Sequence, residues 1–395
     1  MKIKNYKNEL IDIDLPKSFK GKKLLVLPTL IDPHVHFRTP GSQYKEDWKT
    51  GSLAALTGGI TTVIDMPNNN PPTIDCKTLM AKKELINSQK DSKIKYYLYL
   101  GATDNNLDEI KKCKNEIIGV KIFMGSSTGN LLIDKKEIQE KIFKKCAELN
   151  LLVAVHAEDE TTIQNNILDL PNNKPSDHSK IRSKKAAIKA VTQALQLSKK
   201  YKTKLYILHV STAEEIKLIK KAKKKGVNVY AEVTPHHLFL NKNDYKTLGT
   251  KALVNPPLRT KKDNEALWNA IKTGIIDTIG TDHAPHTLKE KEKQMGVAPG
   301  GLPSIENYLS LLLTAYDKGK ITMEKIVELT HTNPQKIFGI PETKDLVIVD
   351  LEKEKIIKNK KQKTKCLWTP YDGWIAKGLP IAIIQNNKLT LIKNN

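Results

Sequence analysis

Eight short apolar runs recur along the chain, each bounded by glycine, proline or polar turn residues. Most are apolar at consecutive positions and rich in β-branched residues, a pattern typical of strands that are buried on both faces. The eight predicted strands are Leu24–Ile31, Thr61–Met66, Lys95–Leu100, Gly119–Met124, Leu151–His156, Lys204–Val210, Asn228–Val233 and Asp277–Thr281. Segments with helical periodicity lie between them, among them Thr78–Ser88, Lys135–Leu149, Ser183–Lys200, Ala213–Lys225 and Asn264–Thr273. This alternation predicts an α/β fold in which eight parallel strands close into a (β/α)8 TIM-like barrel.

The two ends of the chain have a different pattern. Residues 1–27 and 343–395 contain short runs that indicate β-strands without intervening helices, and Asp345–Leu351 alternates as a strand does. We therefore expect residues 28–342 to form the barrel. The two ends together are expected to form a small β-rich domain.

Two segments are predicted as connections. The runs Leu379–Ile384 and Lys388–Ile392 flank Gln385-Asn386-Asn387, a sequence that favours a hairpin turn. Residues 287–303 are rich in charged residues and end in Ala-Pro-Gly-Gly followed by Leu-Pro, so we expect a mobile loop there.

Composition changes this picture mainly through charge. The 395 residues include 66 Lys and Arg against 43 Asp and Glu, a formal net charge of +23. A surface that binds nucleic acid or acidic lipid would explain that charge. We favour the alternative, lysines scattered over solvated helix faces, because basic runs such as Lys220–Lys225 fall where a helix would end and no nucleic-acid-binding module is recognisable.

The cysteines and the N-terminal residues indicate a reducing compartment. The four cysteines are far apart, which predicts buried, reduced thiols rather than a disulfide scaffold or a cysteine-based zinc site; they are Cys76, Cys113, Cys146 and Cys366. Residues 1–15 mix lysines and acids with apolar residues and lack the apolar core of a signal peptide. No run is long enough to cross a bilayer. We therefore expect a soluble, cytoplasmic protein.

The first candidate for chemistry is a histidine pair. The first predicted strand leads into Asp32-Pro33-His34-Val35-His36. Two residues at i and i+2 on a strand project to the same side, so both imidazoles can bind one metal ion. A His-x-His pair alone is a weak signal, because core packing produces many of them.

A lysine within the fourth predicted strand is the second candidate. Lys121 lies in Gly-Val-Lys-Ile-Phe-Met, and a lysine in such an apolar run is rarely buried unless it is paired or modified. Burial favours the neutral amine, which can capture carbon dioxide as a carbamate that bridges two cations. The alternative is a lysine that extends its ammonium group to solvent.

Three further strand ends complete a possible ligand set. His156 ends the fifth strand, His209 lies near the end of the sixth, and Asp282 lies in Thr-Asp-His-Ala-Pro-His after the eighth. Each alone suits a hydrogen-bonded core residue, but together they offer the nitrogen and oxygen ligands that zinc prefers. All fall at the C-terminal ends of strands, the catalytic face of such barrels. A metal can activate water and polarise a carbonyl, and Asp282 can move a proton to a leaving nitrogen, which is the chemistry of cyclic-amide hydrolysis.

This set resembles the amidohydrolase superfamily, with His-x-His on strand one, Lys on four, His on five and six, and Asp on eight. The resemblance covers about residues 25–340. Within that superfamily, the segment His36-Phe37-Arg38-Thr39-Pro40-Gly41 is similar to the dihydroorotase signature. The other matching segments are Met66-Pro67-Asn68, Asn255-Pro256-Pro257-Leu258-Arg259, Thr281-Asp282-His283-Ala284-Pro285-His286 and Lys121 in Lys-Ile-Phe-Met-Gly. The lysine resembles that of dihydroorotases in which a carboxylated lysine, rather than an aspartate, bridges the metals.

The resemblance implies a reaction and a set of roles. The reaction is the reversible cyclisation of N-carbamoyl-L-aspartate to (S)-dihydroorotate in pyrimidine synthesis, with two zinc ions and a CO2-derived carbamate on Lys121. One zinc would be held by His34, His36, Lys121 and Asp282, and the other by Lys121, His156 and His209. Asp282 would also be catalytic, and the substrate would be bound by Arg38, Asn68, Asn255 and His286.

Some of these roles have structural alternatives. The planar fork of Arg38 suits a substrate carboxylate, but it also suits a structural ion pair. Asn68 and Asn255 equally suit the capping of turns. Glu232 and His237, in Ala-Glu-Val-Thr-Pro-His-His, are candidates for supporting the ligands or for an accessory metal position.

The loop after the fourth strand is a further candidate. Gly125–Asn130 follows Lys121 and carries small hydroxyl residues between glycines, so it can fold over a substrate at the barrel mouth. The alternative is an ordinary turn that caps the next helix.

The sequence alone is also compatible with other functions. Hydantoinases and allantoinases share the metal set but resemble the chain less at Arg38 and Asn68, and a non-catalytic scaffold should have lost ligands that are all present. Only 33 residues precede His34, which predicts a shortened N-terminal part of the small domain. The expected partner is the small-molecule substrate, with neither nucleic acid nor membrane, and a homodimer is the assembly considered.

Overall fold

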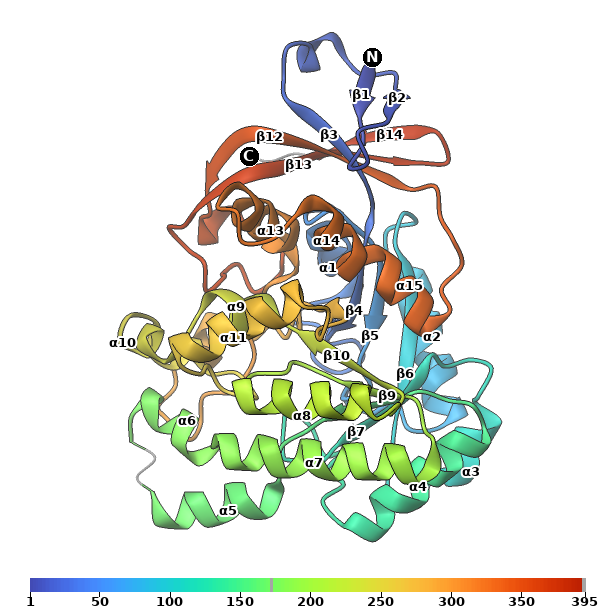
Figure 1. Ribbon diagram of the computed structural model, residues 1–395, viewed down its shortest axis with the longest axis vertical. Helices are drawn as coiled ribbons and strands as arrows, with labels where there is room; N and C mark the ends of the chain where they lie inside the picture. The colour runs from blue at the N-terminus through green and yellow to red at the C-terminus, as the bar shows by residue number, and fades with distance from the viewer. Residues whose placement is uncertain (171–172, 393–395) are drawn as a thin grey trace.

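The computed structural model describes residues 1–170 and 173–392 and is built around an eight-stranded parallel sheet (Figure 1). The strands pair in chain order; they are β4 (Leu30–Val35), β5 (Ile60–Asp65), β6 (Lys95–Gly101), β7 (Gly119–Phe123), β8 (Val153–His156), β9 (Leu205–Ile207), β10 (Val229–Val233) and β11 (Thr278–Ile279). The sheet closes because Val35 forms a parallel bridge with His283, and the His36 amide donates to the His283 carbonyl at 2.8 Å. The predicted (β/α)8 barrel is confirmed.

Helices connect the strands and surround the barrel (Figure 1). They are α1 (Trp48–Thr57), α2 (Cys76–Gln89), α3 (Leu107–Lys112), α4 (Lys136–Glu148), α5 (Glu160–Asp169), α6 (His178–Ile181), α7 (Lys184–Tyr201), α8 (Ala213–Lys224), α9 (Pro235–Phe239), α10 (Tyr245–Leu248), α11 (Lys261–Lys272), α12 (Leu288–Lys291), α13 (Tyr308–Asp317), α14 (Met323–Val327) and α15 (Asn333–Phe338). Asp75 caps α2 and Thr212 caps α8, each in a reciprocal capping box, which explains why these helices begin there. Across the two described ranges, no helix is long and apolar enough to cross a membrane.

Several connections are single helical turns. These are η1 (Lys17–Phe19), η2 (Pro175–Asp177), η3 (Lys242–Asp244), η4 (Gly249–Ala252), η5 (Ile305–Asn307), η7 (Asn359–Lys361) and the π-helical η6 (Glu328–Thr332). Inside the barrel, Phe338 packs edge-on against Tyr99 and Tyr206. Phe338 ends α15, which comes up to the N-terminal ends of the strands, so aromatic side chains occupy the barrel interior near that end. The catalytic groups of such barrels lie at the opposite, C-terminal end of the strands.

The two chain ends build a second, antiparallel sheet. Its strand order is β14 (Lys388–Leu391), β13 (Ile375–Gln385), β12 (Leu346–Ile356) and β3 (Leu24–Pro28). Asn386 and Asn387 have φ values of 49° and 60°, the left-handed conformation that a tight hairpin requires, and the predicted turn is confirmed. The sheet packs on α13, where the Lys377 amide donates to the Thr314 hydroxyl at 2.9 Å. The hairpin of β1 (Lys2–Lys4) and β2 (Leu10–Asp12) forms a separate two-stranded sheet.

Two predicted segments differ from the structure. The run Leu24–Ile31 is two strands, because β3 pairs with β12 in the small sheet whereas Leu30 pairs with Ile60 in the barrel. Each sheet buries apolar side chains from its part of the run, so the sequence shows no break between the two strands. The predicted mobile loop 287–303 instead begins with α12, and its Lys291 is completely buried.

The cysteines also differ from expectation. Cys76, at the start of α2, and Cys113, at the end of α3, form a disulfide with Cα atoms 5.5 Å apart. Cys146 and Cys366 are buried free thiols. The expectation of four reduced cysteines is wrong for the first pair. Their separation of 37 residues concealed a contact that arises only because α2 and α3 are neighbours in the fold.

Candidate active site

The predicted ligands converge at the C-terminal mouth of the barrel. One recessed cavity is lined by all six of them, which are His34, His36, Lys121, His156, His209 and Asp282. Three of the predicted substrate contacts, Arg38, Asn68 and Asn255, line the same cavity. The six predicted ligands come from five different strands, and each lies in or just beyond its strand. Barrel closure therefore brings the residues of the sequence motifs together at one site.

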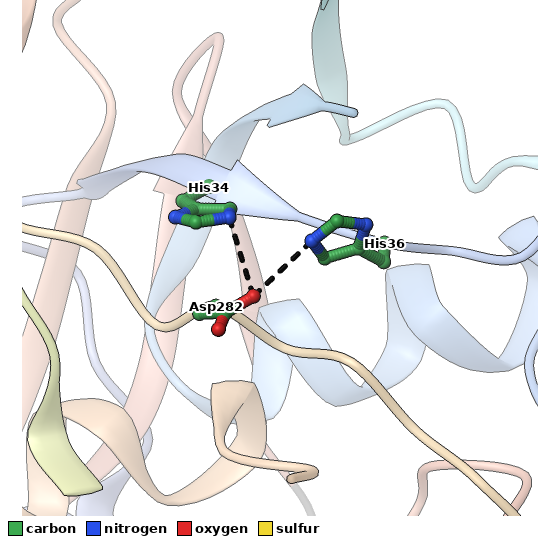
Figure 2. Close-up of side chains that lie close together, drawn as sticks. All are labelled: His34, His36 and Asp282. Carbon is green, nitrogen blue, oxygen red and sulfur yellow. Dashed lines mark ion pairs between the residues drawn. The ribbon is translucent and has the colours of Figure 1, made fainter. Parts of the chain in front are cut away.

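His34, His36 and Asp282 form the tightest cluster. The two His Nε2 atoms lie 3.2 and 3.1 Å from Asp282 Oδ1, as Figure 2 shows. Two imidazole nitrogens and a carboxylate oxygen at this spacing can hold a metal ion. Burial lowers the pKa of His34 to about 4 and that of His36 well below its usual value, so both rings are neutral and have a lone pair to donate.

Hydrogen bonds fix which nitrogen of each ring faces the cluster. Glu232 Oε1 lies 2.8 Å from His34 Nδ1, and Asn68 Oδ1 lies 2.7 Å from His36 Nδ1. An oxygen acceptor requires N–H at Nδ1, which leaves Nε2 with the free lone pair. Glu232 thus supports a ligand. Burial raises its pKa to about 8, and the Tyr206 hydroxyl also donates to it at 2.9 Å.

The second group of predicted ligands is Lys121, His156 and His209. His156 Nδ1 lies 3.0 Å from His209 Nε2, and the two rings are nearly perpendicular. Nδ1 of His209 is buried and, within the described chain, has no hydrogen-bond partner. A buried nitrogen of this kind is costly unless something binds it, so it fits a metal ligand.

Lys121 is buried, with the carboxyl groups of Asp282 and Glu232 near enough to act on its charge. Its side chain lies at 1% exposure, with Nζ 4.6 Å from the ring centroid of Phe123. Among residues 1–170 and 173–392, no carboxylate lies within ion-pair distance of it. Burial lowers the pKa of Lys121 to about 7, so a large fraction of the amine is neutral near neutral pH. The alternative of a lysine that reaches solvent is wrong.

The backbone at the site is strained. Arg38, His209 and Asp282 have φ values of 58°, 38° and 46°, in the left-handed region that residues with a Cβ rarely adopt. Asp32 helps to hold this conformation, because its carboxylate accepts hydrogen bonds from the Thr281 amide at 2.9 Å and the Thr281 hydroxyl at 2.5 Å. The carboxylate of β4 therefore fixes the residue next to Asp282.

Arg38 is buried at the edge of the cavity and remains charged. Its Nε donates to the Pro285 carbonyl at 3.0 Å and its Nη2 lies 3.1 Å from His286 Nε2, while no hydrogen bond within the described residues uses Nη1. Burial lowers the pKa of Arg38 to about 10, still above neutral pH. Lys45 Nζ lies 3.1 Å from His286 Nδ1. A neutral imidazole accepts at one nitrogen only, so one of the two cationic contacts of His286 is not a hydrogen bond.

The predicted substrate contacts therefore differ in position. His286 lies behind Arg38 and is fully buried. Asn68 uses both ends of its amide, because Oδ1 accepts from His36 and Nδ2 donates to the Thr128 carbonyl at 2.8 Å. Asn255 Oδ1 accepts from His178 Nε2 at 2.9 Å, which leaves the Asn255 amide nitrogen for a ligand.

The loop after β7 lies over the cavity and does not cap a helix. Ser127 and Thr128 line the cavity. The next helix, α4, begins at Lys136, and no side chain caps it, so the interpretation of the loop as a helix cap is wrong. Arg182 donates to the Ser126 carbonyl and also pairs with the buried Glu158, which anchors the start of the loop.

Several supporting residues had no signal in the sequence. Those that contact a site segment from elsewhere in the chain are Asp32, Glu46, Lys82, Glu158, His178 and Lys291. The ring nitrogens of His237 contact Thr234 Oγ1 and the Pro256 carbonyl. His237 therefore supports the loop that carries Asn255. Most of these residues are charged, but the sequence does not show which charged residues are buried. Their partners lie so far away along the chain that no sequence pattern identifies the pairs.

A larger cavity lies at the other end of the barrel. It has a volume of about 640 Å³ and is lined by Tyr96–Leu98 in β6, by residues that precede β7, β8 and β9, and by the end of α15. Its charged side chains are three lysines and Glu116, which pairs with Lys83. Because it contains no set of acid, base and ligand groups, we place the chemistry at the smaller cavity.

The sequence and the fold both have known relatives. The amidohydrolase family matches residues 25–359. A dihydroorotase of Pyrococcus horikoshii is 41% identical over 380 residues, which is 94% of this chain and 82% of that protein. The multifunctional protein CAD of Squalus acanthias is 36% identical over 377 residues, which is 95% of this chain but 15% of that protein. An L-hydantoinase from Arthrobacter aurescens has a TM-score of 0.90 and 27% sequence identity, covering 98% of this chain and 91% of that one.

Proposed function

Since this chain belongs to the amidohydrolase family and, within it, to the dihydroorotases, we propose that its site interconverts N-carbamoyl-L-aspartate and (S)-dihydroorotate. The observation that carries this proposal is that the cluster of His34, His36 and Asp282 shares one cavity with the Arg38 guanidinium. The cluster suits the hydrolysis of a cyclic amide. The guanidinium suits a ring that bears a carboxylate.

The donor set fits two zinc ions bridged by a carbamate on Lys121. His34, His36 and Asp282 would hold one ion, His156 and His209 the other, and carboxylated Lys121 both. The buried unpartnered Nδ1 of His209 and the buried Lys121 amine support this assignment. When bound, the metals supply a water of lowered pKa and polarise the ring carbonyl.

The residues of the chain then have separate tasks. Arg38 binds the substrate carboxylate, with His286 behind it and Asn68 and Asn255 at the cavity wall. In the hydrolytic direction, water adds to the ring carbonyl and the bond from that carbon to the ring nitrogen breaks. Asp282 takes the proton from the water and delivers it to the departing nitrogen. Cyclisation follows the same path in reverse.

A turnover assay tests the function directly. The purified protein should convert dihydroorotate faster than hydantoin or allantoin, because only the first carries the carboxylate that Arg38 recognises. Faster turnover of hydantoin would favour the hydantoinase alternative, which the likeness to solved hydantoinase structures motivates. Metal analysis of the same sample should give two zinc ions per chain. No turnover of any of the three compounds would favour the non-catalytic scaffold.

We predict that the loop after β7 contributes to turnover. Replacing Ser127 and Thr128 by Ala removes two hydroxyls at the cavity, and we expect kcat to fall about tenfold, the effect of losing a hydrogen bond made in the transition state. Zinc content and melting temperature should stay at wild-type values. Ser88→Ala, which removes an exposed hydroxyl on α2, is the control. Unchanged kcat with a lower melting temperature would show that the loop is only structural.

We also propose that the protein acts in the cytoplasm on these small molecules, with a homodimer as the assembly to be tested by sedimentation velocity. The charge of +23 does not require another partner. A salt-dependent affinity for DNA or RNA would contradict that view.

A further inference from the structure

Two stretches of backbone line the cavity without offering a metal ligand. They are Val254–Asn255 and Gly300–Gly301, and with the flanking Leu253 and Pro299 we call them the substrate wall. The two stretches touch each other, because the Gly301 amide donates to the Leu253 carbonyl at 2.9 Å. A Cβ atom on Gly300 would lie 3.1 Å from the side-chain amide nitrogen and oxygen of Asn255, so a side chain there would force Asn255 to shift by a few tenths of an ångström.

The substrate wall contains backbone donors that the protein does not use. Within the described residues, the backbone N–H groups of Asn255 and Gly300 form no hydrogen bond. The ring of a cyclic ureide carries carbonyl oxygens that such N–H groups can bind. For this to work, the two stretches must be held at a fixed separation, because a hydrogen bond weakens steeply with misalignment.

A single buried side chain holds both stretches. Lys291, at the end of α12, has 0% exposure, and its Nζ donates to the carbonyls of Leu253 at 2.8 Å, Pro299 at 2.8 Å and Gly301 at 3.1 Å. The protonated amine has three N–H donors, one for each of these carbonyls, and burial lowers the pKa of Lys291 to about 7.

Burying the Lys291 ammonium group without a carboxylate partner costs more free energy than a structural contact alone would justify. In the described part of the chain, no carboxylate forms an ion pair with it, and the ring centroid of Trp368 lies 5.9 Å from Nζ. An unpaired buried ammonium carries a large desolvation cost. The Trp368 indole N–H donates to the His286 carbonyl at 2.7 Å, so the aromatic neighbour of Lys291 also supports His286, which contacts Arg38.

We propose that Lys291 is a positioning residue for substrate binding, which fixes the two halves of the substrate wall through its three hydrogen bonds to their carbonyls. It does not touch the substrate. Its effect is to place the N–H groups of Asn255 and Gly300 where the ring oxygens bind. This inference rests on the proposed function, because the wall is defined by the cavity that takes the ring.

The test compares two lysine variants of the full-length, zinc-loaded enzyme. Lys291→Met keeps the length of the side chain and removes the three donors. Lys204→Met is the matched control, because the Lys204 ammonium also donates to a backbone carbonyl, that of Ile337, at the other end of the barrel. We expect KM for dihydroorotate to rise about tenfold in Lys291→Met while kcat stays within about threefold, since the loss is in ground-state and transition-state binding alike. Zinc content should equal that of the control.

Each outcome decides the proposal. A KM for Lys291→Met equal to that of Lys204→Met would overturn it, as would a fall in kcat and zinc content with unchanged KM. If Lys291→Met does not fold, the test uses Lys291→Gln, whose side-chain amide retains two N–H donors, and its KM is compared with that of Lys204→Met. A rise in KM of about threefold or more then supports the proposal, and a KM equal to that of the control overturns it. Wild-type protein that does not turn over dihydroorotate would instead reject the proposed function, which separates the two failures.

Discussion

Lys121→Ala is expected to lose bound zinc and to reduce dihydroorotate turnover by about a thousandfold or more, because the water and the carbonyl would no longer be activated by metal. Lys121 lies in β7 at 1% exposure and lines the cavity with all the histidine ligands. In the proposed assignment, removing its amine removes the group that would hold both zinc ions as a carbamate. Zinc per chain and kcat, measured on the same sample, test the prediction.

Chemical rescue makes this test specific. Acetate or propionate has a carboxylate that can occupy the space of the missing carbamate, so either should partly restore both zinc and turnover in Lys121→Ala. Lys204→Ala removes a half-buried lysine at the opposite end of the barrel and should respond to neither acid. Full activity of Lys121→Ala without added acid would reject the bridging role.

Arg38→Lys is expected to raise KM for dihydroorotate about thirtyfold or more, because one ammonium cannot reproduce the two parallel hydrogen bonds of a guanidinium to a carboxylate. The guanidinium is buried and held by the Pro285 carbonyl and His286, so its orientation is set before the substrate arrives. Zinc content should be unchanged, since Arg38 contacts none of the six ligands through a hydrogen bond. Steady-state kinetics with metal analysis provides the measurement.

A substrate without a carboxylate is the control for Arg38. Dihydrouracil has the same ring but no charge for Arg38 to bind, so the weak turnover of this compound should change little in Arg38→Lys. If both compounds lose activity equally, or if zinc is lost as well, Arg38 is a structural residue and the carboxylate is bound elsewhere.

The sequence determined the architecture and the set of chemical groups. Strand and helix periods are local properties, so the alternation of eight apolar runs with helices predicted the barrel. The period of two along a strand placed His34 and His36 on one side, and the rule that catalytic groups lie at the C-terminal ends of barrel strands selected His156 and Asp282. Lys121 was selected because a lysine within an apolar strand is rarely buried unless it is paired or modified. The Asn386-Asn387 turn was equally local. These predictions needed no knowledge of which distant segments touch.

The tertiary structure decided everything that depends on contacts between distant segments. Glu232 fixes the tautomer of His34 from 198 residues away, and Asp32 holds Thr281 across 249 residues. The division of Leu24–Ile31 between two sheets and the burial of Lys291 beneath the substrate wall also appear only once the barrel has closed. The physical reason is that burial and pairing of a polar group depend on its neighbours in space. A sequence pattern records only its neighbours along the chain.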